Sequence, residues 1–117
     1  MESEPFVVAT TEHGKIAITP EAIADIVGRA TAESYGVVGL TGRGRMSRLF
    51  PWGIRKGVDV RLEEEGLAVE IRVVVEHGLK LAEVSAAVRE RVTYELERMV
   101  GLPVASLAVH IEKVRSH

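Results

Sequence analysis

The second half of the chain changes its hydrophobic period twice. From Leu67 to Val75, apolar and more polar side chains mostly alternate, which is the two-residue period of a strand with one buried face. Apolar positions then recur every three or four residues, which predicts a helix over 79–100 that ends before Pro103. Alternation returns over 107–111 and predicts a second strand. A strand, a helix and a returning strand form a crossover, which is right-handed when the two strands are parallel.

The helix predicted over 79–100 carries one apolar stripe, whose members have the spacing of a single helix face: Leu81, Val84, Val88, Val92, Leu96 and Met99. Most of the charged residues of this segment lie off the stripe. The stripe must pack against the neighbouring sheet, because nothing else nearby is apolar enough to cover it.

The first half of the chain predicts shorter elements. A strand over 14–18 precedes the run Thr19-Pro20-Glu21, which is a strong helix start. Threonine caps free amides, proline suits the first helical position, and glutamate is favourable at the positive end of the helix dipole. We therefore expect a helix over 20–35, followed by a strand over 37–40.

A third strand is predicted over 58–62, and the turn Glu64-Glu65-Gly66 should join it to the strand at Leu67 as an antiparallel hairpin. We expect residues 1–13 to be a flexible leader. Within it, Phe6–Ala9 form at most an edge strand. The expected architecture is a two-layer α+β sandwich, a single domain over 14–117. A mixed sheet of four or five strands carries both helices on one face.

The composition indicates an ordinary globular domain. The chain has 117 residues, 46% of them hydrophobic and 27% charged, and it contains no cysteine, which excludes disulfides and thiolate metal sites. No apolar run approaches the roughly 20 residues of a membrane-spanning helix, and the acidic start does not resemble a signal peptide. We therefore expect any membrane association to be peripheral or through a partner.

Charge is spread unevenly along the chain. The net charge is −2, but no acidic residue occurs between Ser34 and Val58, where five cations give a segment charge of +5 against −7 for the remainder. The cations interleave with Met46, Leu49 and two aromatic residues in a long predicted loop over 43–57. Such a loop suits phosphate or lipid contacts; alternatively, its aromatic residues fold back on the core as a lid.

Groups that would indicate catalysis are sparse. The two aspartates lie on separate predicted elements, and the four histidines show no metal-ligand spacing. His77 ends a strand before Gly78, a place where site residues occur, but a partly exposed histidine at a strand end is the favoured interpretation. Gly39, Gly42 and Gly44 suggest a phosphate loop only weakly, because no Gly-Lys-Ser/Thr ending follows.

Three blocks of the sequence resemble the alkaline shock protein family of bacterial envelope-stress proteins. They are GKIAITPEAI from Gly14, SYGVVGL from Ser34, and VVVEHG from Val73 continued by ERMVGLPV from Glu97. The resemblance implies a cytoplasmic, non-enzymatic protein with no cofactor, metal or catalytic residue. Some relatives self-associate and are held at the membrane by a small integral-membrane partner, and others are tied to lipid or acyl-CoA metabolism. Histidine at position 77, where the family usually has tyrosine, is a departure.

Three functions follow as hypotheses. The favoured one is a self-associating scaffold that docks to partner proteins; the second is a nucleic-acid-binding protein that uses the basic loop, and the third is an enzyme or ligand-binding domain at position 77. Replacing the first three arginines of the loop with alanine tests the second. The candidate partner-binding residues are Arg43, Arg45, Arg48, Phe50, Trp52, Arg55, Lys56 and His77.

Overall fold

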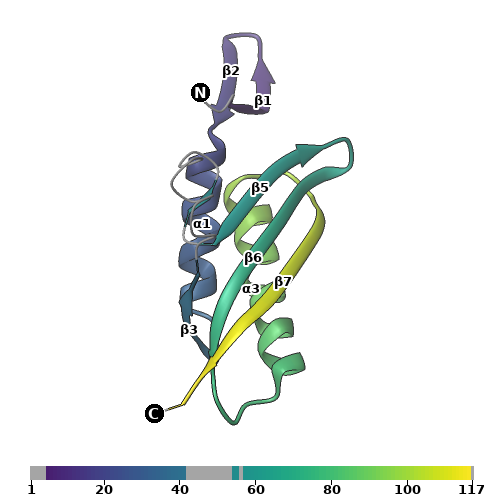
Figure 1. Cartoon of the computed structure of the whole chain (residues 1–117). Coiled ribbons are helices and arrows are strands. Elements are labelled where there is room, and N and C mark those ends of the chain that lie inside the picture. Colours follow the sequence, from purple (N-terminus) through teal and green to yellow (C-terminus); the bar gives the residue numbers. More distant parts are fainter. Residues whose placement is uncertain (1–4, 42–53, 56, 117) are drawn as a thin grey trace.

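The structure is a computed structural model that describes residues 5–41, 54–55 and 57–116, with 54–55 described for the backbone only. Two helices lie on one face of a long curved sheet, and a small hairpin extends beyond one end (Figure 1). In chain order the elements are β1 (Phe6–Thr11), β2 (Gly14–Ile18), α1 (Pro20–Ala32), β3 (Val37–Leu40), β4 (Ile54–Arg55), β5 (Val58–Glu63), β6 (Gly66–Glu76), α3 (Leu81–Met99) and β7 (Val104–Arg115).

Strand β6 is the centre of the sheet. One of its edges pairs antiparallel with β5 and then, further along, with β3, while β7 pairs with β6 in parallel. Strand β4 adds to the outside of β5, so the main sheet has five strands. The predicted mixed sheet and α+β class are confirmed. The parallel pairing of β6 and β7 also confirms the predicted crossover through α3.

Both helices bury their apolar stripes against the sheet. Four α3 valines and leucines spaced four residues apart are buried, and they meet alternate residues of β6 in one core. Helix α1 begins as predicted: Thr19 Oγ1 accepts a hydrogen bond from the Ala22 backbone amide at 3.1 Å. Its stripe includes Ile23 and Val27, both fully buried. The predicted ends of α1 and α3 exceed the observed ends by one to three residues, because 3.6-residue periodicity does not locate a helix cap.

The N-terminal region differs from the expected leader. Strands β1 and β2 form their own two-stranded sheet, with a turn between Thr11 and Gly14, and neither joins the main sheet (Figure 1). The predicted domain boundary at 13/14 therefore falls inside a hairpin. The flexibility expected for residues 1–4 lies outside the described residues. Sequence periodicity missed this hairpin because the alternation from Phe6 to Thr11 is weak.

Candidate interaction surfaces

The predicted basic loop starts and ends at the middle of β6. Thr41, just after β3, donates its backbone amide to the Arg72 carbonyl at 3.0 Å, and the Arg72 amide donates to the Gly57 carbonyl at 2.9 Å. Strands β3 and β5 therefore line up end to end along one edge of β6, and Thr41 and Gly57 both bond to Arg72. Of the candidate site residues in this segment, Arg43, Arg45, Arg48, Phe50, Trp52 and Lys56 lie outside the described residues, as does the Arg55 side chain.

Backbone packing at this junction is tight. Gly57 has a φ of 88°, and a Cβ built on it would lie 2.1 Å from the Thr41 carbonyl oxygen and 2.9 Å from that of Arg72. A side chain at position 57 would therefore force backbone atoms apart. Glycine is required here both for its conformation and for its lack of a side chain.

On the sheet face away from the helices lies a polar group that sequence reasoning did not predict. The Arg72 side chain is 2% exposed, and its three guanidinium nitrogens have no hydrogen-bond partner among the residues that the structure describes. The nearest carboxylate is that of Glu70, whose Oε1 lies 3.9 Å from Arg72 Nη1 and 3.5 Å from His110 Nε2. Thr41 Oγ1 donates to Glu112 Oε1 at 3.0 Å on the same sheet. Alternation along β6 places Arg72 on this face, but no sequence pattern indicates that its side chain is buried.

His77 lies in the turn after β6 and is exposed. Its backbone amide donates to the Arg115 carbonyl at 2.8 Å, which ties the turn to the end of β7. Within the described part of the chain, no group of three or more histidine, cysteine, aspartate or glutamate side chains is placed to hold a metal ion. The His77 backbone therefore helps to hold the turn against β7. A binding role for its side chain stays a prediction.

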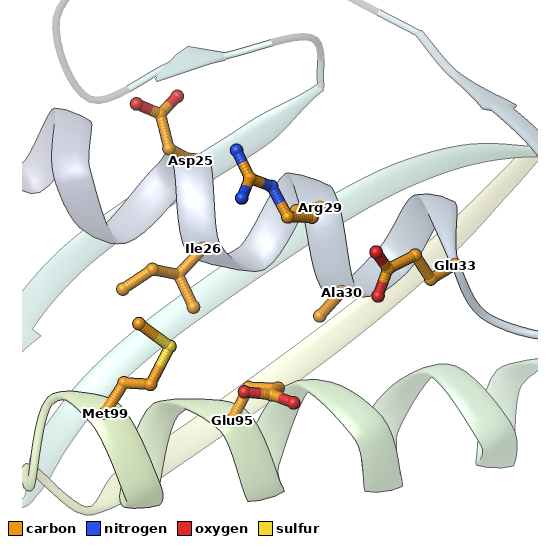
Figure 2. A pocket seen from close by; sticks show the side chains of 7 residues that line it. All are labelled: Asp25, Ile26, Arg29, Ala30, Glu33, Glu95 and Met99. Atoms are coloured by element: carbon orange, nitrogen blue, oxygen red, sulfur yellow. The ribbon is translucent and has the colours of Figure 1, made fainter.

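A small hollow of about 170 Å³ lies between the two helices, and Figure 2 shows the side chains around it. Ile26 and Ala30 from α1 and Met99 from α3 form an apolar floor, while four charged side chains form the rim: Asp25, Arg29, Glu33 and Glu95. Met99 is 56% exposed although it belongs to the predicted apolar stripe. The last turn of α3 therefore leaves an apolar side chain at the surface.

Ion pairs link α1 and α3 beside this hollow. Arg91 bonds Glu33 of α1 at 2.7 Å and lies 3.7 Å from Glu95, and Glu95 accepts a 2.7 Å bond from Arg98. The hydrogen bond and charge of Glu95 raise the pKa of the exposed Arg98 guanidinium. Pairs of this exposed kind are worth only tenths of a kcal/mol each. They leave the charges on this side of α3 compensated within the chain.

Strand β7 lies at an edge of the main sheet (Figure 1). Among the described strands, β6 alone pairs with it, so its outer edge has no strand partner. Two register shifts, at Ala105 and Glu112, bracket a regular run over 106–111. This run contains no aspartate, glutamate, lysine or arginine. Charges and bulges are the usual means of keeping an edge strand from pairing with another chain, and here both lie outside the run.

Comparison with known proteins settles the family. The model of the alkaline shock protein 23 family, described as having a cell envelope-related function, matches residues 8–116. The chain belongs to this family. The resemblance seen in its three sequence blocks is therefore confirmed, and the envelope-related description applies to the family that contains it.

Relatives of this alkaline shock family protein cover nearly its whole length. It is 32% identical to the uncharacterized protein YloU of Bacillus subtilis (strain 168), over 90% of this chain and 92% of YloU. It is 31% identical to the uncharacterized protein Spy1614 of Streptococcus pyogenes serotype M6, over 90% and 91% of the two chains. A second Bacillus subtilis protein, YqhY, is 33% identical over 86% of this chain and 77% of its own.

Solved structures with the same fold come from a protein titled MamM-CTD. The structure titled MamM-CTD 215-293 superposes with a TM-score of 0.56 at 18% identity, covering 80% of this chain and 96% of that one. A cadmium form of a variant of that domain gives 0.56 at 19% identity over 80% and 95%. At this identity the likeness concerns the fold alone. In the described part of the alkaline shock family protein, no helix is long and apolar enough to cross a membrane.

Proposed function

We propose that this alkaline shock family protein is a non-enzymatic scaffold of the bacterial envelope that works by self-association. The observation that carries the proposal is the unpaired outer edge of β7. Unpaired backbone amides and carbonyls along a strand of this length are a template for a strand from another chain. The envelope-related description of the family supplies the setting.

The pairing that fits this edge best is antiparallel, with Ala108 facing Ala108 of a second copy about a two-fold axis. In that register Ser106 faces His110 of the second copy, and the charged end of β7 extends past the start of the other strand. The small methyl group of Ala108 lets the strands approach closely on the open face. On the opposite face, half-buried Leu107 and Val109 would lose further exposed area, which favours association.

Substitutions at Ala108 test the pairing, because this exposed side chain lies outside the hydrophobic core. We expect wild-type protein to form concentration-dependent oligomers in sedimentation velocity. Ala108→Lys and Ala108→Glu should each weaken β7 pairing at least about tenfold, because like charges would face each other across the axis. Mixing the two variants should restore association, since lysine then faces glutamate.

The matched control is Ala32→Lys, which adds the same charge at an exposed position on α1. It should associate like the wild type. A wild-type protein that stays monomeric at the highest concentrations would refute the proposed function, and a full-size assembly from Ala108→Lys would remove β7 as its basis. Docking to a membrane-anchored partner, a cytoplasmic location and nucleic-acid binding by the basic loop stay predictions from the sequence.

A further inference from the structure

The charged side chains on the two flanks of α3 differ in whether they form ion pairs within the chain. On the flank that faces α1, Arg91, Glu95 and Arg98 are all engaged in ion pairs within the chain. On the outer flank, Arg89 and Glu97 are exposed, and neither side chain has an ion-pair or hydrogen-bond partner in the described structure. The two flanks therefore differ in what they leave available for another molecule.

Thr93 stands midway between these two uncompensated charges. The spacing of four residues on either side puts all three on one helix face, with Arg89 and Glu97 separated by about 12 Å along the axis. A shallow hollow of about 570 Å³ covers the same face, lined by Ala86, Arg89, Glu90, Thr93, Tyr94 and Glu97. Small side chains at its centre allow another helix to approach, and the 61%-exposed Tyr94 offers apolar area beside them.

We propose that a second copy of this chain docks on this face, with the two α3 helices antiparallel about a two-fold axis through Thr93. This axis reverses the position of each residue along the helix and keeps its lateral offset. The two rows Arg89–Thr93–Glu97 therefore face each other when the helices cross at about 50°, the angle at which the i±4n ridges of both helices run parallel. Arg89 of one copy then faces Glu97 of the other, and the reverse pair forms at the same time. Both uncompensated charges become paired, which is the complementarity that identifies a second copy as the occupant.

This inference rests on the proposed function, since it names a second surface for the same self-association. The α3 face and the β7 edge share no residue, and each joins two copies. Two self-complementary surfaces assemble a protein beyond a dimer when their two-fold axes differ, because every pair formed through one surface then still presents the other. We therefore expect wild-type oligomers larger than dimers, which suits a scaffold.

Charge reversal in an Ala108→Lys background isolates the α3 contact at protein concentrations too low for the weakened β7 pairing. This protein should sediment as a dimer. Adding Arg89→Glu or Glu97→Arg should convert it to a monomer, since each change creates two like-charge contacts across the axis. Carrying both changes should restore the dimer with the pair exchanged. Glu64→Arg, a reversal at the exposed β5–β6 turn, should leave the dimer unchanged.

Cross-linking tests the position of the axis. The chain has no cysteine, so Thr93→Cys introduces its single thiol. Helix axes 8–10 Å apart leave roughly 4–5 Å between Cα atoms that point at each other, within reach of a disulfide. Mild oxidation of Thr93→Cys should give a covalent dimer in which the α3 charge pairs are retained. Mild oxidation of Ala32→Cys should give no covalent dimer.

Two results would overturn the α3 contact. One is a monomeric Ala108→Lys variant with an intact α3, and the other is a dimer in that background that survives Arg89→Glu. Either result leaves the proposed function standing if wild-type protein still associates through β7. Conversely, a wild-type assembly that Arg89→Glu dissociates to monomers and Ala108→Lys leaves unchanged would support the α3 contact and remove β7 from the proposal.

Discussion

Replacing Gly57 with alanine tests whether the junction between β3 and β5 is as tight as the structure shows. Gly57 adopts a φ of 88°, where an L-residue costs about 1–2 kcal/mol. The added Cβ would also lie 2.1 Å from the Thr41 carbonyl oxygen, which is backbone and cannot rotate away. The two chain segments must separate, and the hydrogen bonds that fix them to Arg72 must lengthen.

The size of the effect follows from these two costs. Forced overpacking costs about 1–3 kcal/mol, so Gly57→Ala should lower the free energy of unfolding by about 2–5 kcal/mol in total. Gly78 supplies the matched control, because its φ is 98° and a Cβ there meets nothing within 4 Å. Gly78→Ala should therefore cost only the conformational part, about 1–2 kcal/mol.

Urea denaturation followed by far-ultraviolet circular dichroism measures both variants at one protein concentration. Both transitions should keep the wild-type m-value, since the surface exposed on unfolding is unchanged. The midpoint for Gly57→Ala should be clearly the lower of the two. Equal losses for the two variants would refute the close approach of Thr41 to Gly57, because only the shared backbone conformation would then matter.

Three further changes have defined outcomes in the same denaturation assay. Gly28→Ala should stabilise the protein by up to about 1 kcal/mol, because the new methyl group meets only a Val58 methyl at 4.0 Å and alanine favours helix; a loss would indicate overpacking. Thr19→Ala should cost about 1 kcal/mol by removing the cap on Ala22, whereas Thr19→Ser should not. Arg72→Met should stabilise by about 1–3 kcal/mol, because the buried guanidinium has no hydrogen bond to any described residue; destabilisation would show that it has a partner.

Much of the candidate interaction surface depends on contacts that no local pattern encodes. The outer charges of α3 are visible in the sequence, but the pairing of Arg91 with Glu33 is a contact between helices and decides which charges remain available. Likewise, the pattern over 107–111 predicts a strand without indicating that its far edge is unpaired. Edge position depends on where β5, β6 and β7 lie relative to one another, which is a property of sheet order.

The sequence by itself determined both described helices, most of the strands, the α+β class and the family of this protein. The hydrophobic period and the helix-capping residues are local signals. The period therefore predicts the β6–α3–β7 crossover, and the capping residue Thr19 predicts the start of α1 that follows it. Only the tertiary structure decided that β3 and β5 meet end to end beside Arg72, that this arginine is buried, and that β1 and β2 stand apart from the sheet. These features depend on which backbone segments pair and on what packs over a side chain, and neither leaves a periodic trace along the chain.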